Sequence, residues 1–268
     1  MAVTSHRIPI TRQKIIEAFS KAALRYDEFS GLQKEIGLRL LEEIEIKKGV
    51  FFVLDIGIGT GWLTEKLVQH FPQAKITGID FAPGMIECAK ERKCKFKIVQ
   101  ADACALPFKN DTFDMVISNL TYQWIANLWG AFGLVYKVLK KGGMFYLSSF
   151  GKRTLQELFI SLDIAIDRKN GNVIFTPKRL ADKEDIEKAL LENGFYDIQV
   201  RTEIMKIHFT DMPSLMRWLK RIGATGMKHD IFIGRELLVR ADDFYKRNFS
   251  DHNKIFASFE IVWGEAKK

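Results

Sequence analysis

Residues 53–61, with the sequence VLDIGIGTG, constrain the fold of this chain more than any other stretch. The first half is a short apolar run typical of a buried strand, and residues 62–70 after it have helical periodicity. Glycines at alternate positions tolerate the positive φ that side chains disfavour, and they let a ligand approach the backbone closely. The stretch therefore predicts a strand, a tight turn and a helix beside a small flat or charged ligand.

The alternation of strands and helices continues along the chain. Two helices are expected before the first strand, and helical and extended patterns then alternate as far as residue 150. We therefore expect an α/β fold with a doubly wound, seven-stranded, mostly parallel sheet of the Rossmann-like type. The expected helices span 15–26, 32–40, 62–70, 84–91 and 121–139, and the strands span 51–56, 75–80, 96–99, 113–118 and 144–149.

After residue 150 the pattern changes. Helices are expected at 154–167 and 183–193, with a turn at Asn170-Gly171 between them, and strands at 198–209 and 254–263. The stretch between these strands is far longer than a hairpin needs, so we expect it to form helices of its own. We interpret 1–268 as one domain with a helical cover (1–46), a cofactor-binding half (47–150), the remaining sheet (151–209 and 254–268) and a helical lid (210–253).

Composition and charge narrow the class of protein. The chain has 268 residues, with 41 Lys and Arg against 33 Asp and Glu, so its net charge of +8 would attract an acidic partner. It has no block of basic residues typical of a nucleic-acid tail, and no apolar run or leader that predicts membrane insertion or export. We therefore expect a cytoplasmic protein without nucleic-acid or membrane partners. Its three cysteines form no C-x-x-C pair, so no metal site is expected.

Two acidic residues indicate which ligand the glycine turn holds. Asp80 ends the second strand, 23 residues beyond Gly57, where a carboxylate can accept hydrogen bonds from both hydroxyls of a ribose. The dinucleotide pattern G-x-G-x-x-G would need a third glycine where Trp62 stands. Asp55 would repel a pyrophosphate, but it can order the loop or bind an ammonium. A nucleoside with a zwitterionic tail fits better than NAD; the alternative is a tight turn and a helix cap without a ligand.

The pattern acidic-x-G-x-G-x-G, matched by Asp55, Gly57, Gly59 and Gly61, resembles that of the class I S-adenosylmethionine-dependent methyltransferases. This resemblance implies S-adenosyl-L-methionine as the cofactor. It also implies cofactor contacts at the ends of later strands: Asp80 and Phe81 beside the ribose, Met85 by the adenine, Asp102 accepting from the adenine amino group next to Ala103, and Asn119 beneath the methionine part. Without the resemblance, Asp102 reads as a solvated loop acid and Met85 as core filler.

A second resemblance extends from residue 19 to residue 264. Its motifs are FSKAA at 19–23 with Tyr26-Asp27 and Leu32-Gln33, SNL at 118–120 with Gln123-Trp124, LKRIGAT at 219–225, and VWG at 262–264. Together they resemble the malonyl-[acyl-carrier protein] O-methyltransferases of biotin synthesis. The chain departs from that family at Thr121-Tyr122 and Gly226-Met227, so another small carboxylic acid or a quinone-type metabolite remains an alternative acceptor. A non-catalytic S-adenosylmethionine-binding protein and an NAD oxidoreductase are further alternatives.

The reaction that this resemblance implies makes few demands on side-chain chemistry. A carboxylate is already ionised at neutral pH, so no general base is required. Tyr26 is a candidate orienting group, and His229 in the predicted lid is the histidine to test. Candidate substrate-binding residues are Tyr26, Gln123 and Trp124, together with Arg217, Lys220 and Arg221 on the basic face of a predicted helix.

The expected partner follows from the same resemblance. It is malonyl-acyl-carrier protein, an acidic protein, or malonyl-CoA. A basic surface around the mouth of the pocket would speed encounter with an acidic carrier and would lose this effect in salt. We expect the protein itself to be a monomer.

Overall fold

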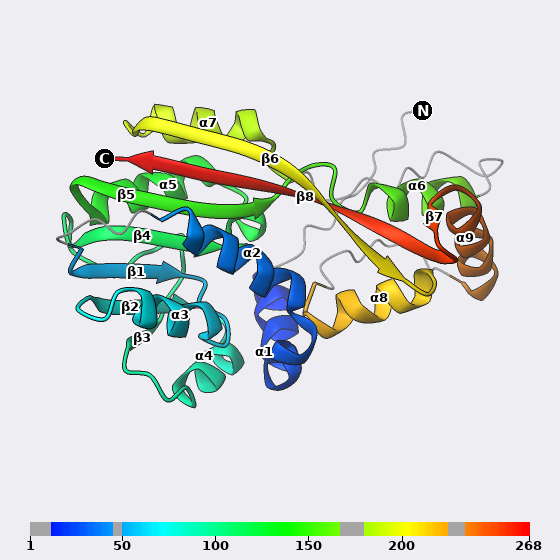
Figure 1. Ribbon diagram of the computed structural model, residues 1–268, viewed down its shortest axis with the longest axis horizontal. Coiled ribbons are helices and arrows are strands. Elements are labelled where there is room, and N and C mark those ends of the chain that lie inside the picture. The colour runs from blue at the N-terminus through cyan, green and yellow to red at the C-terminus, as the bar shows by residue number, and fades with distance from the viewer. Residues whose placement is uncertain (1–11, 45–49, 167–179, 225–233) are drawn as a thin grey trace.

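One mixed sheet forms the centre of the computed structural model, which describes residues 12–44, 50–166, 180–224 and 234–268 (Figure 1). Its strand order is β3-β2-β1-β4-β5-β8-β6, and a short β7 pairs with β8. Strands β1 to β5 pair in parallel, whereas β8 is antiparallel to both β5 and β6. The strands are β1 (Phe52–Ile56), β2 (Lys75–Asp80), β3 (Lys97–Gln100), β4 (Phe113–Asn119), β5 (Leu139–Phe150), β6 (Tyr196–Phe209), β7 (Ser250–Asp251) and β8 (Lys254–Lys267).

The central strands are apolar on both faces because both faces are covered. Successive residues of a strand point to opposite sides of the sheet. Val53, Met115 and Ile117 accordingly belong to the core on one face, and Leu54 and Val116 to the core on the other. Near-continuous apolar runs such as those of β1 and β4 are expected where a parallel sheet is buried on both sides.

Helices cover the two faces in separate layers. Helices α2 and α3 contribute to the first core, and α5 and α7 to the second. The helices are α1 (Arg12–Phe29), α2 (Gly31–Glu42), α3 (Trp62–His70), α4 (Pro83–Lys90), α5 (Leu128–Val138), α6 (Gln156–Ala165), α7 (Lys183–Glu192), α8 (Met212–Arg221) and α9 (Arg235–Asn248), with a short 3₁₀ helix at Tyr122–Trp124.

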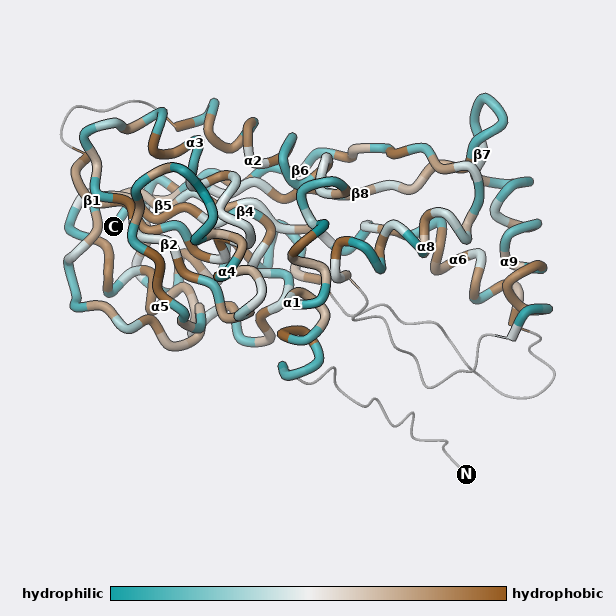
Figure 2. Tube along the Cα trace, turned by 90° about the horizontal axis from the view of Figure 1, so that it is seen from below, coloured by the Kyte–Doolittle hydropathy of each residue, from teal (hydrophilic) through white to brown (hydrophobic). Residues whose placement is uncertain are grey.

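Strands β6 and β8 extend past the rest of the sheet and carry α6, α8 and α9 beside their far ends (Figure 1). Figure 2 shows the same separation from below, with α1 between this group and the glycine-rich half of the sheet. The indole Nε1 of Trp218 in α8 donates to the carbonyl oxygen of Phe29 at 2.9 Å, and the Arg221 guanidinium lies over the Phe29 ring. Helix α8 therefore packs against the C-terminal end of α1.

The fold class and all seven expected strands are confirmed. Most element bounds lie within four residues of the prediction, and two differences are larger. The continuous helix expected at 121–139 is wrong: the 3₁₀ helix ends at Trp124, and Asn127 starts α5 by accepting a hydrogen bond from the Gly130 backbone at 3.0 Å. Strand β5 begins five residues earlier than expected, because Leu139 pairs with Phe113 as soon as α5 ends. The predicted turn at 170–171 lies outside the described residues.

The predicted insertion before the last strand does contain helices, α8 and α9, in its described part. Helix α8 begins where the Asp211 side chain accepts from the Ser214 backbone at 2.7 Å, a capping arrangement that satisfies an otherwise orphaned amide. Within the described ranges, no helix is long and apolar enough to cross a membrane.

Candidate functional site

The glycine turn after β1 lies at the carboxyl ends of β1 and β4, where the direction of winding reverses. Gly57 and Gly59 border a crevice there, and Gly61 borders neither of the two cavities found beside the turn. Gly57, Gly59 and Gly61 all have positive φ, of 79°, 55° and 79°. At Gly57 a side chain is excluded twice, because an added Cβ would also lie 2.0 Å from Thr121 Oγ1. The turn therefore depends on glycine at this position, and Gly61 begins α3 directly after it.

Asp80 at the end of β2 holds the glycine turn in place. Its carboxylate accepts hydrogen bonds from the backbone of Gly59 at 2.9 Å and of Ala82 at 2.8 Å. The side chain is buried, and this burial raises the pKa of Asp80 to about 6 although the backbone hydrogen bonds oppose the shift. Asp80 is thus placed between the glycine turn and the first turn of α4, where it borders two cavities, one on each side.

Asp55 is the penultimate residue of strand β1, and its side chain is buried. Its Oδ2 accepts a hydrogen bond from Thr64 Oγ1 at 2.7 Å. Burial raises the pKa of Asp55 to about 7, and the nearby charge of Asp80 adds to this shift. A cationic group beside Asp55 would favour its ionised form, so the pair of buried acids is suited to a ligand that brings a positive charge.

The first cavity lies between the glycine turn and the two N-terminal helices. Phe19 of α1 and Trp124 form an edge-to-face pair at its border, with ring centroids 5.2 Å apart. Burial and the charges of Asp80 and Asp27 raise the pKa of Tyr26, so its phenol stays protonated at neutral pH. The N-terminal helices and the junction between them contribute six residues to the lining of the first cavity: Phe19, Tyr26, Asp27, Ser30, Gln33 and Lys34.

The second cavity lies beyond Asp80, beside the ends of β2 and β3. Asp102 and Ala103 border it together with Phe81. The Asp102 carboxylate accepts from the Cys104 backbone at 2.9 Å and forms an ion pair with Arg12 at the start of α1. A hydrogen-bond acceptor flanked by apolar groups can bind the amino edge of an aromatic base.

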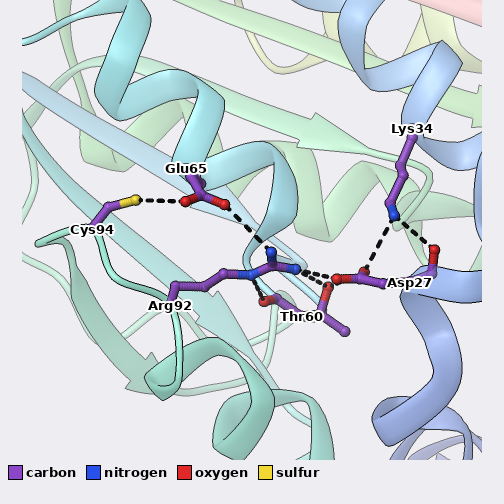
Figure 3. A network of polar contacts seen from close by, with 6 residues as sticks. All are labelled: Asp27, Lys34, Thr60, Glu65, Arg92 and Cys94. Atoms are coloured by element: carbon purple, nitrogen blue, oxygen red, sulfur yellow. Dashed lines mark hydrogen bonds and ion pairs between the residues drawn. The ribbon is translucent and has the colours of Figure 1, made fainter.

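Polar contacts fasten α1 to the glycine turn (Figure 3). The Asp27 carboxylate accepts from Thr60 Oγ1 at 2.7 Å and forms an ion pair with Arg92. The same guanidinium donates from Nε to the carbonyl oxygen of Thr60 at 2.9 Å and contacts Glu65. Lys34 Nζ donates to the Asp27 carbonyl oxygen at 2.7 Å. These contacts hold the C-terminal part of α1 against the glycine turn.

The structure brings most of the predicted residues together. Asp55, Gly57, Gly59, Asp80, Phe81, Met85, Asn119, Tyr26 and Trp124 border the first cavity, and Asp102 and Ala103 border the second. Gln123 borders neither; it is buried, and its amide donates to the Leu120 carbonyl oxygen at 2.6 Å. Arg217, Lys220 and Arg221 are exposed on α8 and also border neither cavity. His229 lies outside the described residues.

Several lining residues had no sequence-based prediction of a role in binding. Phe19, Ser30, Lys34 and Thr121 are examples, as is Arg12 in the second cavity. Helical periodicity predicts that α1 has a buried face, but it does not say whether that face meets core or ligand. Over the described residues, no group of three or more His, Cys, Asp or Glu side chains is placed to hold a metal ion.

Comparisons with known proteins agree with this geometry. Residues 54–147 match a family model described as a methyltransferase domain. The malonyl-[acyl-carrier protein] O-methyltransferase of Gallionella capsiferriformans is 33% identical to this chain, and the alignment covers 97% of this chain and 91% of that protein. The protein of the same name from Bacillus cytotoxicus is 31% identical, with 97% of this chain and 93% of the relative covered.

Solved structures resemble the chain at lower identity and show its fold. A S-adenosylmethionine-dependent methyltransferase from Archaeoglobus fulgidus superposes with a TM-score of 0.52 at 21% identity, covering 91% of this chain and 98% of its own. Phosphoethanolamine N-methyltransferase 2 of Haemonchus contortus, in complex with S-adenosyl-L-methionine, gives 0.59 at 20% identity, covering 93% of this chain and 57% of its own. The glycine crevice and the near full-length sequence match thus agree, and the chain belongs to the malonyl-[acyl-carrier protein] O-methyltransferase family.

Proposed function

We propose that this protein transfers a methyl group from S-adenosyl-L-methionine to the free carboxylate of a malonyl thioester on acyl-carrier protein, an early step of biotin synthesis. The observation that carries the proposal is the match to relatives of this name over 97% of the chain, which includes both helical additions as well as the cofactor half. The product is a methyl ester, which removes the negative charge at the end of the acyl chain.

The residues present fit the methyl donor. Asp80 presents a buried carboxylate at the end of β2 for the ribose hydroxyls, and Asp55 presents a second one for the ammonium of the methionine part. Phe81 and Met85 offer apolar surface for the adenine, and Asp102 can accept from its amino group. All five residues already border the two cavities, so these assignments require no rearrangement of the fold.

The chemistry needs alignment more than acid or base. Bound S-adenosyl-L-methionine supplies a methyl group on a sulfonium; the attacking carboxylate oxygen forms the new bond to carbon as the carbon–sulfur bond breaks, leaving a neutral thioether. The chain's own contribution is to hold the reactants in line and exclude water, which can lower a barrier by roughly 7–11 kcal/mol. Phe19, Tyr26 and Trp124 border the cavity on its covered side and are the groups we assign to this task. We propose Tyr26 as the orienting group, because its protonated phenol can donate to an acceptor oxygen.

The acidic carrier is the partner that the charge of this protein favours. We propose that Arg217, Lys220 and Arg221, exposed on α8, contact the carrier and not the reacting carboxylate. Charge reversal at two of them, Arg217→Glu with Lys220→Glu, should raise the KM for malonyl-carrier and weaken its dependence on salt, while the KM for a free malonyl thioester stays unchanged. Lys137→Glu on α5 with Lys188→Glu on α7 is the matched control, because it changes the net charge equally on the other face of the sheet.

The direct test is transfer of a labelled methyl group to malonyl-carrier, malonyl-CoA and free dicarboxylic acids, with mass spectrometry of the carrier. A gain of one methyl ester on the malonyl-carrier supports the proposal. Transfer to a free acid or to a quinone-type metabolite, with none to the malonyl thioesters, would contradict it. We also expect a monomeric cytoplasmic protein that does not need nucleic acid, and the molar mass in solution checks the first of these.

A further inference from the structure

The junction between α1 and α2 carries two buried polar atoms without a protein partner. Ser30, 1% exposed, precedes α2, yet its hydroxyl makes no capping hydrogen bond. Gln33, 9% exposed, lies on the first turn of α2. Among the described residues, Ser30 Oγ and Gln33 Oε1 are two of five buried side-chain atoms that lack any hydrogen-bond partner. A buried polar group left in this state costs about 1–3 kcal/mol.

Both atoms belong to residues that border the first cavity, so a bound ligand can satisfy them. Loose packing of the junction does not explain them, because the surrounding backbone is held. Asn119 Nδ2 donates to the Gln33 carbonyl oxygen at 3.0 Å, and Lys34 Nζ donates to the Asp27 carbonyl oxygen at 2.7 Å. The junction is therefore a fixed structure with two unused hydrogen-bonding groups in the lining of a pocket.

The charged groups of the same cavity indicate which part of a ligand lies there. Asp55 from β1 and Lys34 from α2 both border it, so an acid and a base face one space. A zwitterion such as an α-amino acid matches this arrangement, because its ammonium can pair with the acid and its carboxylate with the base. The second cavity is bordered by Asp80, Asp102 and Arg12, and its one base already forms an ion pair with Asp102. Lys34 lies farther from its own acidic neighbour, with Nζ 3.9 Å from the Asp27 carboxylate.

We propose that the α1–α2 junction binds the amino-acid end of the methyl donor. Gln33 Oε1 accepts a hydrogen bond from the ammonium, alongside Asp55, and the Ser30 hydroxyl donates to the carboxylate, alongside Lys34. The helical cover thus forms part of the donor site itself, in addition to any contact with the acceptor. It follows that the cover distinguishes the intact donor and its demethylated product from nucleosides that lack the amino-acid part.

Calorimetric binding to the whole protein, with no acceptor present, tests this inference independently of the proposed acceptor. The ligands are S-adenosylhomocysteine and 5′-methylthioadenosine, which share the nucleoside but differ in the amino-acid part. Gln33→Leu should weaken S-adenosylhomocysteine binding about ten- to fiftyfold, the effect of losing a hydrogen bond to a charged group. Ser30→Ala should weaken it less, and both variants should leave 5′-methylthioadenosine binding within about twofold of the unmodified protein. Gln69→Leu, exposed on α3, is the matched control.

Two further measurements exclude a general structural effect. Thermal unfolding without ligand should be unchanged or improved in Ser30→Ala and Gln33→Leu, because each removes an unpaired buried atom. Gln33→Glu keeps an acceptor oxygen and should retain more affinity for S-adenosylhomocysteine than Gln33→Leu. The inference is overturned if both ligands lose affinity equally, if neither does, or if Gln33→Glu binds more weakly than Gln33→Leu.

Discussion

Helices α1 and α8 are both amphipathic additions to the central sheet, yet they meet different surroundings. Helix α1 contributes Phe19, Tyr26 and Asp27 to the lining of the first cavity, whereas α8 contributes no residue to either cavity. The apolar face of α8 packs against α1 and the extended part of the sheet, with Trp218 bonded to the Phe29 carbonyl oxygen. An apolar stripe shows that a helix packs, but not whether it packs on a ligand or on another helix. We therefore expect changes under α1 to affect donor binding and changes under α8 to affect stability.

The largest effect is expected where α1 rests on α4. A Cβ at Gly84 would lie 2.5 Å from the Ser20 carbonyl oxygen of α1, and backbone cannot yield as a flexible side chain can. Gly84→Ala should lower the free energy of unfolding by about 1–3 kcal/mol, as overpacking does, and weaken donor binding about thirtyfold by displacing the cover. Denaturant unfolding and calorimetry with S-adenosylhomocysteine measure the two effects.

The control for this substitution is Gly31→Ala at the start of α2. A Cβ there would meet nothing within 4 Å, so stability and donor affinity should stay at or above those of the unmodified protein. If Gly84→Ala destabilised the protein without loss of donor affinity, α1 would be a structural helix like α8, and the contrast between them would fail.

A smaller effect is expected from the contacts that tie α1 to the glycine turn. Arg92 joins the Asp27 carboxylate to the Thr60 carbonyl oxygen, with its side chain 20% exposed. Arg92→Met keeps most of the side-chain length and removes these contacts, so donor binding should weaken about tenfold, close to 1.4 kcal/mol. Arg25→Met is the matched control, because Arg25 forms an ion pair with Glu28 on the exposed side of α1. Equal donor affinities of the two variants would contradict a role for the network in closing the cover.

The buried acids beneath α1 should make donor binding depend on pH. Burial raises the pKa of Asp55 to about 7 in the free protein, and an ammonium beside it would lower that pKa. Donor binding then releases a proton, and the affinity should rise about eightfold between pH 6 and pH 7.5. Asp55→Asn should bind more weakly and lose most of this dependence. A pH-independent affinity in the unmodified protein would place the ammonium away from Asp55.

The same shift has a consequence for stability. A folded pKa above the unfolded value means that the folded protein holds a proton which the unfolded chain has released. The free energy of unfolding should therefore fall as pH rises from about 4 to about 7, and Asp55→Asn should remove this part of the fall. Chemical denaturation of the two free proteins across this range measures it.

The sequence predicted the sheet and its glycine crevice well because both depend on local patterns. Strand β2 and helix α3 have the expected bounds, and Asp80 and Asp102 border cavities beside the glycine turn. Buried strands and glycines with positive φ are predictable from short sequence patterns. The break after Trp124 is harder to predict, because it depends on a helix cap at Asn127 within an otherwise apolar helical pattern.

The substrate side was less accessible from sequence for a physical reason. Whether Gln123 faces a ligand or bonds to Leu120, and whether Lys34 or Arg221 approaches the pocket, depends on how distant segments pack. The extension of β6 and β8 places α8 away from strands β1 to β3 (Figure 1), and no local sequence pattern encodes that placement. The unpaired atoms of Ser30 and Gln33 show the reverse case, because only the packed structure reveals that they lack partners.

The smallest effect on donor binding is expected from α8 itself. Trp218→Phe keeps a large apolar ring among Phe209 and Phe259 but removes the hydrogen bond to the Phe29 carbonyl oxygen. The free energy of unfolding should fall by about 0.5–1.5 kcal/mol, the net contribution of one such bond, and donor affinity should change less than twofold. Phe29 directly precedes Ser30, so greater mobility at the end of α1 would first change the position of the α1–α2 junction. A loss of donor affinity as large as that of Arg92→Met would show that α8 positions this junction, and the two helices would then have to be treated as one cover.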